Sequence, residues 1–255
     1  MLRRLREAER NFKRASPRLL KSTSTSIEAP LRPLLLRALA TTTGDDGAYP
    51  TARPVIHGLP GSKLTYFPSR SQGGHMICFG HAIAARCLFL ESDAATKRYR
   101  TNPMILPLQE YRYLPSIVRI DADQKLHVEE IRYSRTLTDN VREDCRLLEA
   151  AFAKEDISFR LFKDTEIHST VDHHNLDFLY RGRFAPMPPG GSDLVMSYLA
   201  DHDGRASLNR LYVHLRKHCI RPVFVLNMVW EGVLHYDHAE RLHSHSTIWL
   251  PNERA

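Results

Sequence analysis

Hydrophobic and polar positions alternate in two neighbouring segments near the middle of the chain. Residues 116–120 and residues 126–133 both show the period of two that is typical of strands, and residues 121–125 between them have turn chemistry. This pattern predicts a hairpin. In residues 138–153 the apolar positions recur three or four apart, which predicts a helix with one buried face. Residues 157–162 are again typical of a strand, so the region is expected to fold as β-β-α-β.

The preceding part of the chain has a less regular pattern. Residues 79–99 carry an apolar stripe at helical spacing and predict a helix, and residues 2–14 predict a second one. Residues 41–75 are rich in Thr, Gly, Asp, Pro and Ser, which favours loops. These residues are expected to lead into the first helix of the core.

The C-terminal part follows a segment rich in Pro and Gly, residues 185–192, which predicts a linker and a domain boundary. Beyond it the pattern predicts helices over 193–201, 207–217 and 222–231, then strands over 232–237 and 246–250. Ser207 is a natural N-cap. Three helices followed by a β-ribbon predict a winged-helix-like domain over 193–255. Such a domain can bind DNA or protein, and the lack of a strong basic face favours protein.

Composition sets broad limits on the class of protein. The chain has 255 residues, 42% of them hydrophobic and 25% charged, which suits one large or two modest globular domains. No apolar run approaches the ~20 residues that span a bilayer, and no signal-type sequence opens the chain, so a soluble protein of the bacterial cytoplasm is expected.

The four cysteines are far apart, which favours reduced, buried thiols over disulfides or zinc. The histidines around 168–174 and 235–245 lack the spacing of a zinc site.

The positive charge is concentrated at the N-terminus. Residues 1–40 contain ten Lys or Arg against three acids, which accounts for the whole net charge of +7. A basic arm on a neutral body is typical of a protein that binds nucleic acid, although a solvated helix would look the same. The candidate DNA-binding residues are the cations of this arm and of the following loops: Arg3, Arg4, Arg6, Arg10, Lys13, Arg14, Lys63 and Arg70.

Four short motifs occur in a suggestive order around the predicted hairpin. They are Tyr113-Leu-Pro-Ser116, Glu129-Glu-Ile131, Lys163-Asp-Thr-Glu166 and Asn175-Leu-Asp-Phe-Leu-Tyr-Arg181-Gly-Arg183. This order resembles the TnsA family, the endonuclease subunit of heteromeric transposases, which belongs to the PD-(D/E)xK class. The resemblance implies an α/β fold with a restriction-endonuclease-like core over 41–184, in which helices flank a mixed sheet.

The resemblance also implies a degenerate active site. Nucleases of this class hold Mg²⁺ with carboxylates and position the attacking water with a Lys. The matching acid, Asp and Lys positions are Ala84, Ser116 and Ile131, so Glu129 is the remaining acid. We therefore expect no cofactor. Asn175, Arg181 and Arg183 match the last motif, and the two arginines are expected to pair with carboxylates rather than with phosphate.

Three functions are consistent with these features. The first is a DNA-binding, TnsA-like subunit of a mobile-element transposition complex, which binds element ends, an integrase-type transposase and an AAA+ ATPase but does not cut. The second is an active Mg²⁺-dependent endonuclease in which Asp121, Asp123, Glu129, Glu130 and Lys125 have taken over catalysis. The third is a DNA-binding regulator that reuses the fold.

Overall fold

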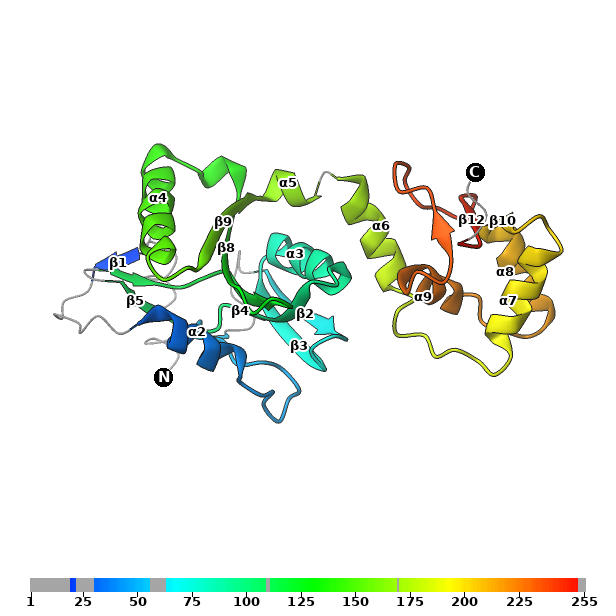
Figure 1. Cartoon of the computed structure of the whole chain (residues 1–255), viewed down its shortest axis with the longest axis horizontal. Helices are drawn as coiled ribbons and strands as arrows, with labels where there is room; N and C mark the ends of the chain where they lie inside the picture. The colour runs from blue at the N-terminus through cyan, green and yellow to red at the C-terminus, as the bar shows by residue number, and fades with distance from the viewer. Residues whose placement is uncertain (1–18, 22–29, 56–62, 109–110, 169, 252–255) are drawn as a thin grey trace. The chain divides into compact units, whose positions relative to one another are not determined.

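The structure, a computed structural model, describes residues 19–21, 30–55, 63–108, 111–168 and 170–251. The chain divides into two compact units, Met1–Ile167 and His168–Ala255, which are described separately below (Figure 1). Within the described ranges, none of the helices combines the length and the apolar character that crossing a membrane requires.

The first unit contains both helices and strands. In chain order its described elements are β1 (Leu19–Lys21), α2 (Leu31–Leu39), β2 (Leu64–Ser69), β3 (Gly74–Phe79), α3 (His81–Ser92), β4 (Thr96–Thr101), β5 (Leu106–Leu108), β6 (Tyr111–Tyr113), β7 (Ile117–Asp121), β8 (Leu126–Arg132), the 3₁₀ turn η1 (Ser134–Thr136), α4 (Asp139–Ala153), β9 (Ser158–Lys163) and α5 (Asp164–His168), whose last residue begins the second unit.

A mixed four-stranded sheet forms the centre of this unit, in the order β4-β7-β8-β9. β4, β7 and β8 are antiparallel, whereas β9 runs parallel to β8. A parallel pair needs a crossover connection, and α4 supplies it. The hairpin, the helix and the third strand expected between residues 116 and 162 are therefore confirmed. Thr138 caps α4, because its hydroxyl accepts the N–H of Val141.

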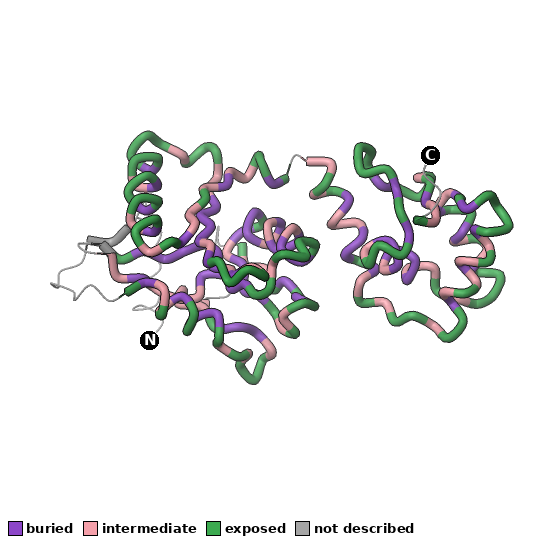
Figure 2. Tube along the Cα trace, in the orientation of Figure 1, coloured by how far each residue is buried: buried purple, intermediate pink, exposed green. Residues whose placement is uncertain are grey.

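Helices cover both faces of this sheet. Val118 and Val128 lie directly opposite each other and belong to a buried cluster that includes residues of α2 and α4. Because successive side chains of a strand point to opposite faces, Glu129 points to the other face, where it contacts α3. One side of α4 is buried and the other exposed, as Figure 2 shows. The expected mixed α/β architecture, a mixed sheet flanked by helices, is confirmed.

Helix α2 belongs to the core, although it lies within the expected basic arm of residues 1–40. Leu31, Leu35 and Leu39 are buried against the sheet. The helix has no side-chain cap of its own and no acid in its first turn. Instead, the two carboxylate oxygens of Glu155 accept the N–H groups of Leu31 and Arg32 at 2.9 and 3.0 Å. The arm therefore cannot extend beyond residue 30, and its first 18 residues lie outside the described part.

Two predictions for the part of the chain before the β7-β8 hairpin were wrong. The helix expected over 79–99 ends at Ser92, because the carboxylate of Asp93 accepts the N–H of Ala95 and the hydroxyl of Thr96 and so stabilises a turn. Strand β4 then begins. The expected loop over 41–75 contains most of an antiparallel hairpin, β2 with β3, which packs on α3. A separate three-stranded sheet has the order β1-β6-β5.

The second unit contains mainly helices. Its elements, after the last residue of α5, are α6 (Val171–Tyr180), α7 (Gly191–Ala200), β10 (Arg205–Ser207), α8 (Leu208–Lys217), α9 (Phe224–Trp230), β11 (His235–Tyr236) and β12 (Thr247–Trp249). The strands form an antiparallel sheet in the order β10-β12-β11. The three predicted helices and two predicted strands are all present. Ser207 caps α8, as expected, by accepting the N–H of Arg210.

The unit boundary lies upstream of the predicted linker. Residues 185–192 lie inside the second unit, because α6 packs on α9 and contributes Leu179 to the same buried cluster as α7, α8 and α9. Gly182 and Gly191 show how close this packing is. A Cβ on Gly182 would lie 2.4 Å from Cβ of Leu226, and one on Gly191 would lie 3.2 Å from the ring of Phe224. The Pro and Gly residues here allow close packing, so their presence does not mark a domain boundary.

Candidate functional site

Two adjacent buried acids occupy the middle of strand β8. Glu129 is 2% exposed and Glu130 is fully buried. Because the strand alternates, the two carboxylates point to opposite faces of the sheet. Each one therefore has a separate environment, and together they do not form a single two-carboxylate site.

The carboxylate of Glu129 is bound by two arginines. Arg86 of α3 donates from Nε and a terminal nitrogen to the two oxygens at 2.7 and 2.8 Å, a bidentate contact. Arg119 of β7 donates from Nε to Oε1 at 2.9 Å. The Arg86 guanidinium also lies 4.2 Å from the ring centre of Phe162 on β9, which helps to hold it in place.

These contacts determine the charge of Glu129. Burial alone would raise the pKa of this carboxyl, but hydrogen bonds and charges from Arg86, and then from Arg119, outweigh burial and lower the pKa below its ordinary value. Glu129 therefore stays ionised at neutral pH as part of a two-cation, one-anion cluster. Both of its oxygens already accept N–H groups.

Glu130 has a different set of partners on the opposite face. Its Oε2 accepts the hydroxyl of Tyr113 at 2.9 Å and that of Ser116 at 3.1 Å. Nε of Arg132 lies 2.6 Å from Oε1, an ion-pair contact without the angles of a hydrogen bond. Ser116 Oγ also accepts the backbone N–H of Ile131 at 3.1 Å. The motif serine is thus a connector between the two hairpin strands.

The register of the hairpin places Ser116 with Glu130, whereas the motif order had grouped it with Glu129 and Ile131. Ile117 lies opposite Glu129, so Ser116 shares its face with Glu130. The residues beside Ser116 that have an acid followed two positions later by a cation are therefore residues 130–132, which end in Arg132. Glu129 and the buried Ile131 lie on the face of the sheet that α3 covers. A shift of register by one residue moves every side chain of a strand to the other face of the sheet, and the turn residues alone do not determine this register.

Ala84 does not complete a site with Glu129. It lies on α3 two residues before Arg86, and residues two apart on a helix point in very different directions. The acid on the last turn of this helix, Glu91, is held by neutral donors. It accepts the hydroxyls of Ser71 and Tyr99 at 2.7 and 2.8 Å, in addition to the Ser69 hydroxyl.

The alternative acids proposed for catalysis are also separated. Asp121 pairs with His127 at 2.8 Å and accepts the N–H of Lys125, and it lies four residues along β7 from Ile117, roughly 13 Å. Asp123 and Lys125 are exposed in the turn. Throughout the described ranges, His, Cys, Asp and Glu side chains form no group of three or more able to hold a metal ion.

The predicted DNA-binding residues are only partly described. Arg3, Arg4, Arg6, Arg10, Lys13 and Arg14 lie outside the described residues. Lys63 and Arg70 are exposed immediately before and after β2. They are therefore separated by the length of that six-residue strand, roughly 20 Å.

The residues of the last motif have structural contacts in the second unit. Asn175 is fully buried; its amide donates to the carbonyl of Glu240 at 2.8 Å and accepts the N–H of Leu242 at 2.7 Å. It thereby joins α6 to the loop between β11 and β12. Arg181 pairs with Asp177 at 2.6 Å, and Arg183 pairs with Glu231 at 2.9 Å. The two arginines contact carboxylates, as expected.

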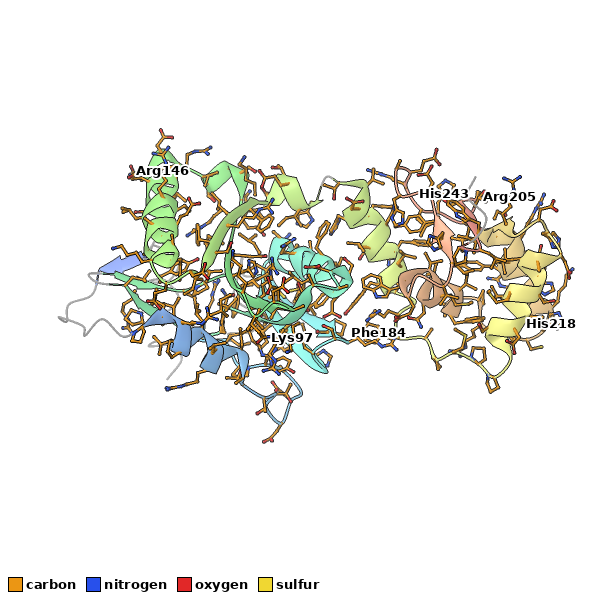
Figure 3. The ribbon with its side chains drawn as sticks, in the orientation of Figure 1. Lys97, Arg146, Phe184, Arg205, His218 and His243 are labelled. Carbon is orange, nitrogen blue, oxygen red and sulfur yellow. The ribbon has the colours of Figure 1, made fainter. Side chains whose placement is uncertain are left out.

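Several histidines of the second unit form ring contacts. His168 and His173 have ring centres 5.1 Å apart, and those of His243 and His245 are 6.1 Å apart. His243 is exposed in the loop before β12, and His218 is exposed at the end of α8 (Figure 3). These geometries are ring packing between neighbours along the chain.

The arginines that bind Glu129 were not predicted from the sequence. Arg119 alternates with the apolar residues of β7, which could have placed it on the face of Glu129 once the register was known. Arg86 comes from another element, and its pairing depends on tertiary packing. Comparison with protein-family models found no match to this chain, and comparison with curated proteins found none either.

Proposed function

We propose that this chain is a DNA-binding, TnsA-like subunit of a mobile-element transposition complex and does not itself cleave DNA. The observation that carries the proposal is the cluster of Glu129 with Arg86 and Arg119. Glu129 is the acid that the motif order matches to the nuclease centre, and it has two fixed cations around its carboxylate. On the opposite face, Glu130 beside Ser116 is held by Arg132.

This cluster disfavours metal-dependent chemistry. Mg²⁺ takes oxygen ligands at about 2.0–2.1 Å in near-octahedral geometry, usually from carboxylates and waters. To bind it, Glu129 would have to release at least one arginine, and the remaining guanidinium groups would repel a divalent cation. Ile131 on the same face supplies neither a ligand nor a proton donor. These features support an inactive centre.

The architecture of both units supports the resemblance. The first unit has the β-β-α-β order with helices on both faces of a mixed sheet, as in restriction-endonuclease-like folds. The second has the order helix, strand, helix, helix, strand, strand from α7 to β12, with β12 between β10 and β11. That is the strand order of winged-helix domains.

The second unit is better suited to protein contacts than to DNA reading. In a winged-helix domain the last helix enters the DNA groove. Here that helix is α9, in which five of the seven residues are buried, and α6 packs against it. We therefore assign DNA binding to the basic N-terminal residues. Protein partners, an integrase-type transposase and an AAA+ ATPase in this proposal, would contact the second unit.

The absence of cleavage can be tested directly. Supercoiled plasmid and duplexes carrying a mobile-element end are incubated with the full chain, in Mg²⁺ and separately in Mn²⁺. We expect no nicking, because Glu129 is engaged by two arginines. Glu129→Gln is the matched variant. Nicking by the unaltered chain that this variant abolishes would disprove the inactive centre.

DNA binding is tested separately from cleavage. The six cations at positions 3, 4, 6, 10, 13 and 14 are replaced by Gln in the full chain, and Arg205→Gln with Arg221→Gln serves as the control. We expect the six-site variant to bind duplex DNA more weakly and with a shallower salt dependence. The slope of log binding constant against log salt concentration should become less steep by about 0.9 for each phosphate that is no longer neutralised. Equal binding by both variants would remove the N-terminal residues from the proposal.

A further inference from the structure

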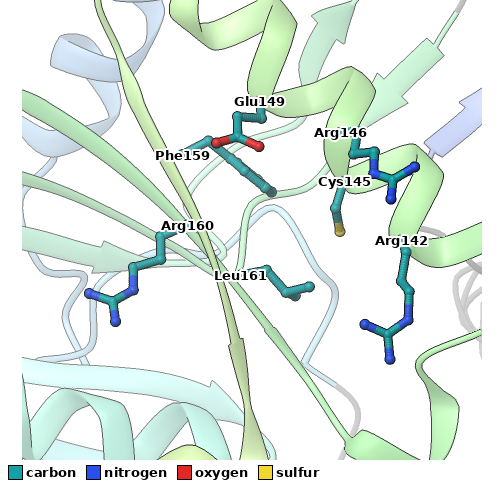
Figure 4. Close-up of a pocket in the computed structure, with 7 residues that line it drawn as sticks. All are labelled: Arg142, Cys145, Arg146, Glu149, Phe159, Arg160 and Leu161. Atoms are coloured by element: carbon teal, nitrogen blue, oxygen red, sulfur yellow. The ribbon is translucent and has the colours of Figure 1, made fainter.

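A groove runs between helix α4 and strand β9, and we call it the β9 groove. It is lined by Arg142, Cys145, Arg146 and Glu149 of α4 and by residues 159–161 of β9, and its volume is about 320 Å³ (Figure 4). None of the contacts described for Glu129 or Glu130 involves these residues. The groove therefore shares no described hydrogen bond or ion pair with the candidate site, although Arg160 stacks on the Phe162 ring that also contacts Arg86.

One wall of the groove is the edge of a sheet. Among the described strands, β9 is the last of the four and pairs with β8 alone. Alternate backbone groups of an edge strand point away from its neighbour. The N–H of Lys163 points outward, since the carboxylate of Glu166 accepts it at 3.0 Å. The backbone groups of Phe159 and Leu161 therefore point outward too.

Arginines flank this edge on both of its sides. Arg142 and Arg146 are one turn apart on α4, and in Figure 4 the side chain of Arg160 extends from the opposite side of β9 to that of Leu161. Arg142 lies 3.9 Å from Asp139 and Arg146 lies 3.0 Å from Glu143, both at exposed positions. Such surface pairs contribute little and exchange readily for another carboxylate.

The floor of the groove is apolar. Phe159 and Leu161 are partly exposed along it. Burial, and then the charge of Glu130, raises the pKa of Cys145 to about 11, so this side chain is a neutral thiol at physiological pH. Glu149 is the one acid among the lining residues, against three arginines. The groove therefore favours an anionic ligand that also has apolar groups.

We propose that an acidic, extended segment of a partner protein binds in the β9 groove and adds a strand beside β9. Its backbone bonds to the outward groups of Phe159 and Leu161, as in other cases of strand addition. Its side chains alternate between the two faces, so neighbouring carboxylates reach Arg142 and Arg146 on one side and Arg160 on the other.

A peptide suits this groove better than a nucleic acid. A strand edge presents donors and acceptors at the spacing of another peptide backbone, which a phosphodiester chain does not match. The partly exposed Phe159 and Leu161 also offer apolar contacts to every second side chain. This inference does not depend on DNA binding by the chain.

The test uses the full chain and a labelled nine-residue peptide of three Glu-Glu-Val repeats. Fluorescence anisotropy measures its binding, and hydrogen exchange measures protection of residues 158–163. We expect binding, slower exchange in that segment, and at least tenfold weaker binding to Arg142→Gln with Arg146→Gln. The control variant, Arg205→Gln with Arg221→Gln, should bind like the unaltered chain.

Two further probes distinguish the ligand classes. The same peptide with an N-methyl group on every backbone nitrogen retains its charge, but the methyl groups block both of its edges for strand pairing, so it should bind at least tenfold more weakly. A 20-base-pair duplex should bind equally to the Arg142 and Arg146 variant and to the control. Absence of peptide binding, equal binding of the methylated peptide, or selective loss of duplex binding would each overturn the proposal.

Discussion

Glu129 shows at the residue scale how a buried charge can be retained without a metal. Removing a carboxylate from water is costly, and well-oriented partners must offset that cost. Arg86 provides two contacts and Arg119 one, while Arg86 itself packs against Phe162. The partners are therefore interdependent, and the loss of one leaves an uncompensated charge in the interior.

This interdependence leads to a stability prediction. Arg86→Met keeps the side-chain length but leaves Glu129 short of its bidentate partner, so we expect a loss of about 3–5 kcal/mol in unfolding free energy. Arg146→Met, at an exposed position of α4, should change it by less than about 0.5 kcal/mol. Urea denaturation followed by circular dichroism measures both.

The two tryptophans of the chain provide an internal control, because the destabilisation by Arg86→Met is expected in the first unit alone. Both tryptophans, Trp230 and Trp249, lie in the second unit, so their fluorescence should report an unchanged transition in Arg86→Met. Adding Glu129→Gln to Arg86→Met should restore part of the stability, because a neutral amide carries no unpaired charge. Equal stability of the Arg86 and Arg146 variants would show that the cluster is not required.

The lowered pKa of Glu129 predicts a pH dependence. A carboxyl whose pKa is lower in the folded state stabilises the fold fully above its ordinary value of 4.5, and this contribution is lost as the pH falls through the folded pKa. The stability advantage of the unaltered chain over Glu129→Gln should therefore shrink as the pH is lowered below 4.5. Urea denaturation at pH 7, 5, 4 and 3 checks this, and a constant difference would contradict it.

At the element scale, the local hydrophobic pattern was sufficient to predict those helices and strands that bury one face in the core. The hairpin β7-β8, helix α4 and strand β9 follow from periods of two and of three to four. Helix α2 was missed because its leucines lie among arginines and a proline, and its cap comes from Glu155. Strands β2 and β3, which pair with each other, were missed because turn residues surround them. Strand β4 was missed because its partner, β7, comes only after β5 and β6 in the chain.

The candidate site was only partly predictable for the same physical reason. Glu129 could be singled out from the motif order, and Arg181 and Arg183 were expected to pair with carboxylates because they match the last motif. The face occupied by Ser116 depends on a register that local sequence did not specify. The contact between Arg86 and Glu129 joins a helix and a strand 43 residues apart, and no local pattern encodes it.

The cap of α2 yields a prediction at this scale. Glu155→Ala removes both acceptors from the first turn of α2 and a favourable charge at its N-terminus, so we expect a loss of about 0.5–2 kcal/mol from the first unit. Glu149→Ala, on the exposed side of α4, is the control and should have little effect. Circular dichroism during urea denaturation measures the difference, and matching curves would show that the cap contributes nothing.

At the scale of the whole molecule, the position of the unit boundary decides which fragments fold. The second unit includes α6, whose Leu179 and Phe178 pack with the cluster around α9. Asn175 additionally holds the loop between β11 and β12. A fragment that starts after residues 185–192 would have none of this packing.

We therefore expect a fragment of residues 168–255 to unfold cooperatively and one of residues 193–255 not to do so. Trp230 and Trp249 are in both fragments, so tryptophan fluorescence during thermal and urea denaturation compares them directly. The physical reason is that α9 would lose its covering helix. A cooperative transition of the same midpoint in the shorter fragment would place the boundary at the Pro and Gly segment after all.

The cap on α2 also has a consequence for synthesis on the ribosome. Leu31 and the carboxylate that caps its helix are 124 residues apart in the chain. At about 5–20 residues per second, Glu155 is made roughly 6–25 s after Leu31. During that interval α2 lacks its cap, and Leu31, Leu35 and Leu39 lack the sheet that buries them. The nascent chain therefore exposes Leu31, Leu35 and Leu39 next to a basic N-terminal segment, a form that chaperones at the ribosomal exit can bind until Glu155 has been made and the sheet has formed.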